Sequence, residues 1–331
     1  MNVVESIKAP IAEDMKLFEE KFRASMKSSV PLLDRITHYI VKRKGKQIRP
    51  MFVFLSAKIF GEITESTHRG ASLIELLHTA TLVHDDVVDN AFERRGFFSI
   101  NALWKNKIAV LVGDYLLSRG LLLAIRNKEF KQLEIVSTAV EEMSEGELLQ
   151  IEKSRGVNLN EEIYFEIIRQ KTATLIASCC ACGAASAGCD DEMIERMRMI
   201  GEKIGVAFQI KDDLFDYGLG GKIGKPTGID IKEKKSTLPL IYALNHSANG
   251  EKRAMLRIVK KDNKKKAEID KVIQYVLDSG GIEYADQKMR ALSSEARTEI
   301  LKLPAGEARD SLLALVEFTI NREKKIVDFP D

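Results

Sequence analysis

The chain has 331 residues, of which 45% are hydrophobic and 30% are charged, and its formal net charge at pH 7 is only +2. This length and composition predict a folded globular protein with a large hydrophobic core, not a disordered chain. The balance of 51 Lys and Arg against 49 Asp and Glu argues against a nucleic-acid-binding protein and against a general attraction for acidic partners.

Neither the cysteines nor the apolar segments indicate an exported or membrane-inserted protein. Three of the four cysteines, Cys179, Cys180 and Cys182, cluster without the spacing of a zinc site, and we expect them to be reduced residues of a helix interface. The segment 1–18 has no continuous apolar run of the signal-peptide type, and no uninterrupted apolar run reaches the ~18 residues of a membrane span. We therefore expect a cytoplasmic protein without stable membrane insertion.

Hydrophobic spacing in steps of three and four residues predicts an all-α protein. Ile194, Met197, Ile200 and Ile204 show this period, whereas alternation with period two is almost absent. No linker rich in Gly, Pro or Ser divides the chain, so a single domain over 1–331 is expected. In chain order the predicted helices are 5–28, 31–43, 48–60, 67–90, 99–104, 108–126, 130–153, 160–187, 190–217, 236–245, 251–261, 265–280, 281–301 and 306–321.

A basic segment precedes the predicted helix 48–60. It contains Lys44, Lys46 and Arg49, the last of them directly before Pro50. Lysine binds a phosphate as a mobile point charge, and arginine binds phosphate oxygens through its planar fork. Each of these residues alone is more often an ordinary surface charge.

The predicted helix 67–90 ends in an aspartate cluster, with the sequence D-D-V-V-D at 85–89. Positions i and i+4 share a helix face, so Asp85 and Asp89 stack while Asp86 flanks them. Carboxylates among apolar residues would take up protons unless cations neutralised them, so the cluster needs a metal or a basic ligand. One cluster of this form, taken alone, is more often an acidic helix surface or a cap.

A second cluster of the same form, D-D-L-F-D at 212–216, lies near the end of the predicted helix 190–217. Mg²⁺ prefers octahedral oxygen coordination, keeps several waters and commonly joins one or two carboxylates to substrate phosphates. Two such clusters in one chain therefore favour a site in which Mg²⁺ ions hold a diphosphate. Basic residues that could contact its oxygens follow both clusters: Arg94, Arg95, Lys225 and Lys235.

The least helical stretch, 218–228, follows the second cluster directly. A flexible basic loop beside carboxylates can close over a ligand, although an ordinary connection between helices is the simpler interpretation. The basic run Lys260–Lys266 lies far from any motif and is interpreted as a solvated turn. Lys211, directly before the second cluster, is either an inward ion-pair partner or a solvent-facing residue, and both interpretations stay open.

The order of these motifs resembles that of the trans-isoprenyl diphosphate synthases, and most of all the long-chain, octaprenyl-type enzymes. The shared segments lie within 44–239 and read G-K-x-x-R-P, H-T-A-T-L-x-H-D-D-V-V-D, R-R-G, G-D-Y-L, K-T, F-Q-x-x-D-D-x-x-D, G-K-P and K-x-T-L-P. Lys44 and Gln47 depart from the commonest pattern, in which a glycine and a basic residue stand there. The resemblance implies an isoprenoid synthase fold, which is a helical bundle around a deep central cavity.

The resemblance implies a head-to-tail prenyl transfer, in which an allylic diphosphate ionises and the double bond of isopentenyl diphosphate attacks the resulting cation. Mg²⁺ would neutralise the charge that develops on the leaving diphosphate. Three Mg²⁺ ions per active site are expected, with Mn²⁺ as the alternative metal. The implied metal ligands are Asp85, Asp86, Asp89, Asp212 and Asp216, while Asp213 would act indirectly.

Two diphosphate pockets follow from the same resemblance. Thr172 is similar to the oxygen donor that stabilises the allylic cation, and Gln150 to a polar residue that faces the first cluster. His84 stays a structural residue in this interpretation. The allylic diphosphate, from farnesyl or geranyl diphosphate, is expected to contact Arg94, Lys171, Lys225 and Lys235, with Gln209 nearby. Isopentenyl diphosphate is expected to contact Gly45, Lys46, Arg49, His78 and Arg95.

The helical turns before the first cluster are expected to set the length of the product. One turn rises about 5.4 Å, similar to one extended isoprene unit, so a bulky aromatic residue one turn before Asp85 would stop growth early. Ala80 and Thr81 are small, and we therefore expect a long product of about C30–C45, for a quinone side chain. The residues that line this path are expected to be Ile74, Leu77, Ala80 and Thr81. Leu116, Leu117 and Leu121 are candidates for its floor, or are plain core leucines.

Other functions remain to be weighed against this one. A short-chain farnesyl or geranylgeranyl diphosphate synthase would normally place a bulky residue near 80 and 81, and a terpene cyclase would not need a second diphosphate pocket. A non-catalytic subunit of a heteromeric synthase would normally have lost aspartates or arginines. A calcium or magnesium buffer would show a different loop pattern. By resemblance the chain forms a homodimer, with 108–126 contributing to the interface.

Overall fold

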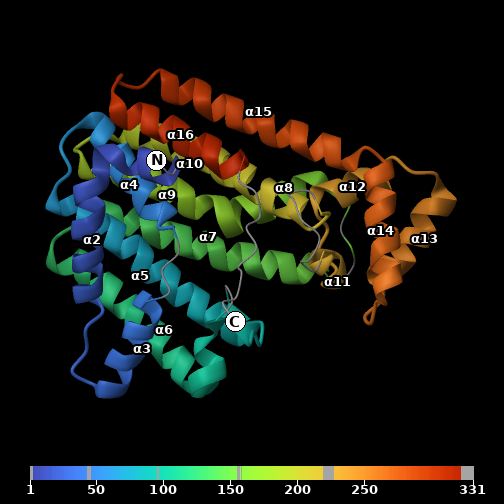
Figure 1. Cartoon of the computed structure of the whole chain (residues 1–331), viewed down its shortest axis with the longest axis horizontal. Helices are drawn as coiled ribbons and strands as arrows, with labels where there is room; N and C mark the ends of the chain where they lie inside the picture. Colours follow the sequence, from blue (N-terminus) through green and yellow to red (C-terminus); the bar gives the residue numbers. More distant parts are fainter. Residues whose placement is uncertain are drawn as a thin grey trace. The chain divides into compact units, whose positions relative to one another are not determined.

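The computed structural model describes residues 3–42, 46–94, 97–154, 157, 159–218 and 227–321, except for the side chain of Arg94. In this part of the chain nearly all secondary structure is helical (Figure 1). The elements are α1 (Val3–Lys8), a 3₁₀ turn (Ala9–Ile11), α2 (Ala12–Ser25), α3 (Pro31–Lys42), α4 (Ile48–Phe60), α5 (Glu65–Val88), β1 (Glu93–Arg94), β2 (Phe97–Phe98), α6 (Ile100–Arg126), α7 (Phe130–Ser154), α8 (Glu161–Ile168), a π turn (Arg169–Ala173), α9 (Thr174–Ser186), α10 (Asp191–Phe215), α11 (Ile229–Lys232), α12 (Leu238–Asn245), α13 (Asn249–Lys260), α14 (Lys266–Asp278), α15 (Gly281–Leu301) and α16 (Glu307–Asn321).

The all-α prediction is confirmed, and the predicted helix 48–60 coincides with α4. Apart from shifted helix ends, five details differ from the sequence-based expectation. The predicted helix 5–28 is divided into α1, the 3₁₀ turn and α2. The predicted helices 99–104 and 108–126 form the single helix α6, with a break at Lys105, whose φ of 71° lies in the left-handed region. The predicted helix 160–187 is interrupted by the π turn. The short helix α11 and the antiparallel pair β1–β2 were not predicted.

The chain divides into two compact units. Unit 1 comprises Met1–Val140, Ile176–Met199 and Leu301–Ala314, and unit 2 comprises Glu141–Leu175, Ile200–Ile300 and Leu315–Asp331. The first aspartate cluster belongs to unit 1 and the second to unit 2.

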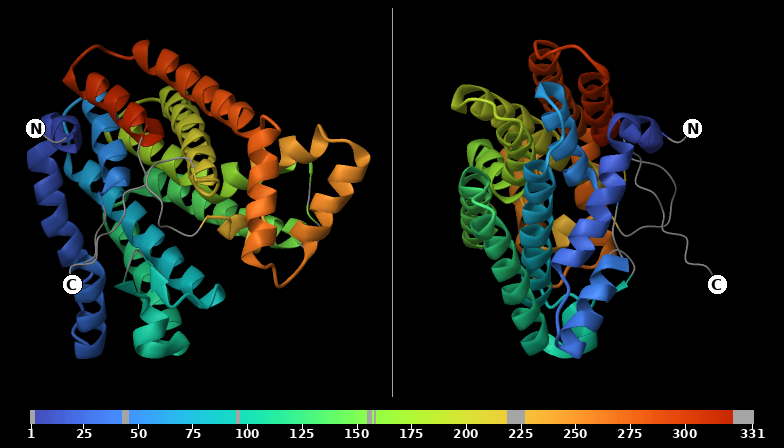
Figure 2. Two further views of the ribbon diagram at one scale, coloured as in Figure 1. Left: turned by 45° about the vertical axis from the view of Figure 1, so that its right-hand side comes forward. Right: turned by 90° about the vertical axis from the view of Figure 1, so that its left-hand side faces the viewer.

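The centre of unit 1 is the pairing of α5 with α6, which run side by side in both views of Figure 2. Two glycines of α6 permit this close approach. A Cβ at Gly113 would lie 2.1 Å from Nε2 of His84, and a Cβ at Gly120 would lie 3.2 Å from the Leu77 side chain. The start of α5 is fixed by reciprocal capping between Thr64 and Thr67. α5 is therefore held at its first turn by capping, and further along by the contacts of Leu77 and His84 with α6.

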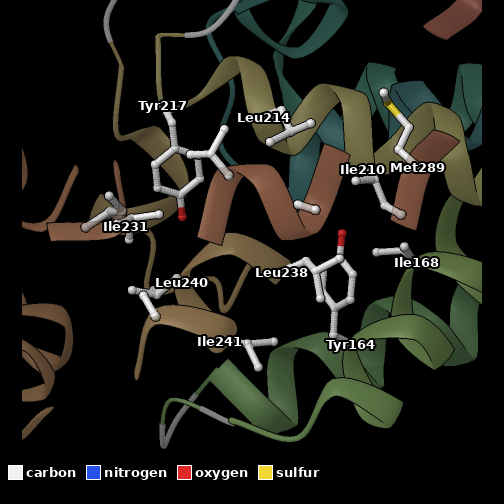
Figure 3. Packing of buried hydrophobic residues seen from close by; sticks show 14 of the residues in the cluster. Tyr164, Ile168, Ile210, Leu214, Tyr217, Ile231, Leu238, Leu240, Ile241 and Met289 are labelled. Atoms are coloured by element: carbon white, nitrogen blue, oxygen red, sulfur yellow. The ribbon is translucent and has the colours of Figure 1, made fainter. Parts of the chain in front are cut away.

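Unit 2 is built around a separate apolar cluster, shown in Figure 3. Two tyrosines lie in it, Tyr164 from α8 and Tyr217 from the turn after α10, and both are almost fully buried. Each hydroxyl has a partner, since Tyr164 bonds to Asp213 and Tyr217 to Thr237. Buried tyrosines need such partners for their hydroxyls. This core therefore contains a buried hydroxyl, that of Tyr164, which hydrogen-bonds directly to Asp213 of the second aspartate cluster.

Candidate active site

The first aspartate cluster occupies the last turn of α5, where Asp89 is the C-cap residue. Asp86 is 4% exposed, Asp85 is partly buried and Asp89 is exposed. The C-terminal end of a helix carries partial negative charge, so carboxylates are disfavoured there unless cations are near. The position of the cluster therefore strengthens the requirement for metal or basic ligands.

The segment after this cluster is tied back to the end of α5. The carbonyl oxygen of Asp86 accepts hydrogen bonds from the Ala91 backbone N–H at 2.9 Å and from Nδ2 of Asn101 at 3.1 Å. The Ser99 hydroxyl donates to the Ala91 carbonyl at 2.6 Å. These bonds fix the base of the β1–β2 ribbon that carries Arg94, whereas the side chain of Arg94 and all of Arg95 lie outside the described residues.

The predicted isopentenyl diphosphate pocket falls at the N-terminus of α4. Gln47 precedes this helix with φ 56°, in the left-handed region, and strained backbone of this kind is often found at functional sites. The free N–H groups of a helix N-terminus favour anions. Lys46 is exposed and Arg49 is partly buried, and Nε of Arg49 has no hydrogen-bond partner within the described ranges. Gly45 lies outside the described residues.

Several predicted residues of α5 are buried in unit 1. His78 is 8% exposed, and its carbonyl oxygen accepts the Thr81 hydroxyl at 2.9 Å. Among the residues expected to set product length, Ile74, Leu77 and Ala80 are buried and Thr81 is partly buried. His84 hydrogen-bonds to the Val110 carbonyl at 3.2 Å and lies 3.5 Å from Asp114, so it joins α5 to α6 as a structural residue should.

The floor residues proposed for the product path differ from one another in position. Leu116 is fully buried in the same cluster as Ala80, and Leu117 packs against that cluster. Leu121 is instead 42% exposed, on the outer side of α6. Leu121 is therefore a surface residue of unit 1 and a poor floor, because it stands five residues after buried Leu116 and so points about 140° away from it around the helix axis.

The second aspartate cluster occupies the last turn of α10 in unit 2, again at the negative end of a helix. Asp213 is 6% exposed, and both of its carboxylate oxygens accept hydrogen bonds. Tyr164 donates its hydroxyl to Oδ2 at 2.8 Å and Gln209 donates Nε2–H to Oδ1 at 2.8 Å. Burial raises the pKa of Asp213 to about 7, with a further contribution from nearby Asp230, while these hydrogen bonds oppose the rise.

The third aspartate of this cluster acts as a cap. One carboxylate oxygen of Asp216 accepts the backbone N–H of Ile229 at 2.9 Å and the other accepts that of Asp230 at 3.0 Å. Its carbonyl oxygen accepts the Gly228 N–H at 2.9 Å. Asp216 therefore holds the first turn of α11 against the end of α10, and its carboxylate satisfies donors that would otherwise lack partners.

A cavity of about 150 Å³ lies beside Asp213 within unit 2. It brings together most of the residues predicted to contact the allylic diphosphate or the allylic cation. These are Lys171, Thr172, Gln209 and Lys235, and the cavity is also lined by Gln150, Tyr164, Asp213 and Asp230. Lys225, the remaining basic residue of this set after Arg94, lies outside the described residues.

Polar contacts orient the side chains of this cavity. The Thr172 hydroxyl donates to Oε1 of Gln209 at 2.8 Å, which directs the Gln209 amide toward Asp213. Lys171 donates to Oε1 of Gln150 at 3.3 Å and pairs with Glu147. Gln150 therefore lies beside Lys171.

Tyr164 and Asp230 are among the cavity residues that the sequence-based interpretation missed. Tyr164 lies on an apolar helical face and looks like a core aromatic, so no signal marks it. Asp230 lies in the short helix α11, which the sequence did not predict, and its Oδ1 lies 3.5 Å from Nζ of Lys235. Burial raises the pKa of Asp230, and the positive charge of Lys235 opposes the rise.

Lys211 is partly buried, and its ammonium lies over the ring of Phe215 at 5.2 Å from the centroid. The sequence left open whether Lys211 is an inward ion-pair partner or a solvent-facing residue. The cation–π contact with Phe215 is an interaction that neither interpretation included.

The carboxylates fit Mg²⁺ better than a metal that requires a complete protein cage. Across the part of the chain that the structure describes, no three His, Cys, Asp or Glu side chains converge on one point. Mg²⁺ commonly takes only one or two carboxylates, and the substrate phosphates and water complete its coordination. Hard carboxylate oxygens at the two helix ends are the donors that this ion prefers.

An all-α fold in which two helices end in aspartate clusters, with a cavity lined by lysines, is the arrangement expected of proteins that bind a diphosphate through Mg²⁺. The polyprenyl synthetase family model matches residues 30–276, and the chain belongs to this family. It is 34% identical over 322 residues to the octaprenyl diphosphate synthase of Escherichia coli (strain K12), covering 97% of this chain and 99% of that protein. The family predicted from the motifs is therefore confirmed.

Two solved structures are similar throughout. The polyprenyl synthase from Caulobacter crescentus CB15, complexed with calcium and isoprenyl diphosphate, is 32% identical with a TM-score of 0.88, and the match covers 97% of this chain and 98% of that one. The geranylgeranyl pyrophosphate synthase from Bacteroides thetaiotaomicron is 36% identical with a TM-score of 0.83, and the match covers 97% and 100%.

Proposed function

We propose that the chain is a Mg²⁺-dependent all-trans polyprenyl diphosphate synthase, which condenses isopentenyl diphosphate head-to-tail onto an allylic diphosphate. The observation that carries this proposal is the cavity of unit 2, where Lys171, Thr172 and Lys235 gather beside the second aspartate cluster. Membership of the polyprenyl synthetase family supports it. We further propose that the two units act as one synthase domain.

The residues of the cavity would bind and stabilise the allylic substrate. Lys171 and Lys235 would contact its diphosphate together with Arg94 and Lys225, and the cations would favour departure of the negative leaving group. Thr172, held by Gln209, would offer its hydroxyl oxygen to the allylic cation. In unit 1, the N-terminus of α4 with Lys46 and Arg49 would bind isopentenyl diphosphate together with Gly45, His78 and Arg95.

The metal is proposed to be Mg²⁺, held by Asp85, Asp86, Asp89, Asp212 and Asp216. It would supply electrostatic stabilisation of the leaving diphosphate. The calcium bound with isoprenyl diphosphate in the similar Caulobacter crescentus structure supports a divalent ion at such a site. The number of three ions per site is part of this proposal.

The product is proposed to be a long polyprenyl diphosphate of about C30–C45, because the residues one turn before the first cluster, Ala80 and Thr81, are small. The similarity to the octaprenyl enzyme supports this length. A geranylgeranyl product is the second candidate, and the similar Bacteroides thetaiotaomicron enzyme favours it.

A homodimer is proposed through the outer face of α6. By length and composition this helix could also cross a membrane, and it is the one such helix within the described ranges. Exposed apolar side chains line this face, namely Val110, Leu111, Leu121, Leu122 and Ile125. Asp114, whose side chain is 61% exposed, interrupts them and would be costly against lipid. A second copy of the chain therefore fits this face better than a bilayer, in keeping with a cytoplasmic enzyme.

The interface can be tested with the double variant Leu111→Lys/Leu121→Lys. We expect sedimentation to show a monomer, because two lysines would be buried in the interface without partners. The matched control is Leu17→Lys on α2, a leucine that is 41% exposed outside this face. A double variant that sediments as the wild type does would rule out this interface.

The decisive experiment is incubation of the purified protein with labelled isopentenyl diphosphate, farnesyl diphosphate and Mg²⁺, with chain-length analysis of the dephosphorylated products. A band between C30 and C45 is expected. A band at C20 would support the second candidate. No incorporation from farnesyl or geranyl diphosphate would reject independent catalysis and favour a subunit that needs a partner.

A further inference from the structure

The helix that carries Lys171 and Thr172 contains a π turn at these residues. The turn spans Arg169–Ala173, and the N–H of Thr174 donates to the carbonyl of Arg169, five residues earlier. π turns are rare and commonly accompany functional sites, because their geometry is less favourable than that of an α-helix and neighbouring contacts must hold it. The neighbouring contacts in unit 2 therefore identify the residues that set the position of Lys171.

Two glycines allow the neighbouring helices to press against this turn. On α7, a Cβ at Gly146 would lie 2.7 Å from Cβ of Gln170 and 2.9 Å from the backbone nitrogen of Lys171. On α10, a Cβ at Gly205 would lie 2.4 Å from Cα of Ala173. Any larger residue at either position would displace the backbone of the π turn.

One carboxylate joins both ends of the turn to α7. Oε1 of Glu142 accepts a hydrogen bond from Nη1 of Arg169, the first residue of the turn, at 3.2 Å. Oε2 accepts the hydroxyl of Thr174, the residue directly after the turn, at 2.5 Å. A single side chain therefore bridges the two ends of the turn, in addition to the backbone hydrogen bond between Thr174 and Arg169.

Arg169 extends this connection to two more helices. It donates Nε–H and Nη2–H to the two oxygens of Glu166 on α8, at 3.0 and 2.8 Å, and lies 3.8 Å from Glu202 on α10. The hydrogen bond with Glu166 is the main reason why the pKa of Arg169 is raised further above its usual range. Bidentate pairs of this kind fix geometry more strictly than single hydrogen bonds. Neither Arg169 nor Glu142 lines the cavity.

We propose that Glu142 is a positioning residue of the synthase, which holds the π turn at both ends and so sets where the Lys171 ammonium and the Thr172 hydroxyl lie in the cavity. This inference rests on the proposed contact between Lys171 and the allylic diphosphate.

Kinetics of Glu142→Ala and Glu142→Gln with each substrate varied in turn test the proposal. Misplacement of a binding group by about 1 Å can cost about a hundredfold, so we expect the KM for the allylic diphosphate to rise about tenfold or more in Glu142→Ala, with a fall in kcat. The KM for isopentenyl diphosphate should stay within about twofold. Glu142→Gln should be intermediate, because its amide can accept a hydrogen bond from only one end of the turn.

The matched control is Glu195→Gln. Glu195 forms the same i, i+3 fork with Arg198 that Glu166 forms with Arg169, but in an exposed part of α10. Its kinetics should equal those of the wild type. Equal rises of both KM values in Glu142→Ala, or an unchanged allylic KM, would overturn the proposal.

A double-mutant cycle with Lys171→Ala separates positioning from general stability. If Glu142 acts through Lys171, the effect of Glu142→Ala on the allylic KM should nearly disappear in the Lys171→Ala background. Additive effects would overturn the proposal. An unchanged allylic KM in Lys171→Ala alone would remove the assigned role of Lys171 and the proposal with it, while wild-type synthesis in the same assay would leave the proposed function standing.

A binding measurement gives a readout that does not need turnover. Calorimetric titration of inorganic diphosphate with Mg²⁺ should show affinity about tenfold weaker in Glu142→Ala than in Glu195→Gln. If the wild type made no polyprenyl product but Glu142→Ala still bound diphosphate more weakly than Glu195→Gln, the result would count against the proposed function alone. Equal affinities would count against the positioning role.

Discussion

The two aspartate clusters have the same sequence form and the same place at the last turn of a helix, yet their surroundings differ. In the first, Asp89 is exposed, and Asp86 is anchored through its backbone carbonyl. In the second, Asp213 and Asp216 are buried, and their carboxylates accept side-chain and backbone hydrogen bonds. A shared motif therefore does not give each aspartate the same role. In the first cluster Asp89 is exposed to solvent, whereas in the second the carboxylates of Asp213 and Asp216 are buried and accept hydrogen bonds.

The largest expected effect tests what the clusters share. Asp85→Asn and Asp212→Asn each remove one charge from the proposed metal site, and the loss of several kcal/mol of leaving-group stabilisation should lower kcat by about 10³-fold or more. Steady-state turnover measures this. Asp191→Asn is the control, since Asp191 is an exposed partner of Lys131. If one of the two variants kept wild-type turnover, only one cluster would serve the reaction.

The next effect concerns the pH dependence of stability in metal-free protein. The pKa of Asp213 is raised to about 7 in the folded state, against about 3.9 in the unfolded chain. Its contribution is fully present below pH ~4 and is lost as pH rises through ~7, because the unfolded chain ionises first. The free energy of unfolding should therefore fall by at most about 4 kcal/mol over this range.

Denaturant unfolding of Asp213→Asn in the presence of a chelator measures that contribution. The variant should lose most of the decline between pH 4 and 7, because an amide side chain at this position does not titrate, whereas Asp191→Asn should keep it. A decline of the same size in Asp213→Asn would show that other groups cause it.

A smaller effect separates the third aspartates of the two clusters. Asp216→Ala leaves two backbone N–H groups of α11 without an acceptor and should cost about 1–3 kcal/mol in the free energy of unfolding. Asp89→Ala changes an exposed residue and should cost less than about 0.5 kcal/mol. Chemical denaturation of the two variants gives the comparison. Equal losses would mean that the buried cap contributes no more than an exposed carboxylate.

The smallest effect on rate, but a clear one on product, is expected from Ala80→Phe on the helix of the first cluster. A ring one turn before Asp85 should shorten the product toward three or four isoprene units, while turnover stays within a few-fold. Overpacking around fully buried Ala80 should cost about 1–3 kcal/mol, which thermal unfolding would report. An unchanged product distribution in a folded variant would disprove the role of this turn in setting length.

The sequence was sufficient to predict the helical fold and some of the residues that line the cavity of unit 2, among them Lys171, Thr172 and Lys235. The predicted bounds of α4 are those observed, and Gly61 stands at its C-cap. The π turn was not predicted, because the apolar residues on both of its sides were interpreted as one continuous helix over 160–187. Tyr164 was missed because a buried tyrosine looks like any core aromatic until its hydroxyl partner is known. Asp216 was expected to bind metal, and this role stays a prediction. The structure shows Asp216 as the cap of α11, which the sequence did not predict.

The π turn also has a consequence for insertions and deletions. A π turn is equivalent to an α-helix with one additional residue. Deleting a single residue such as Gln170 would allow α8 and α9 to merge into one regular helix with both flanking segments close to their present orientations, and only the residues of the turn itself would change direction. The helix would survive while Lys171 left the cavity. Length variation among related chains should therefore be absent from this turn, even where the neighbouring residue types are free to change.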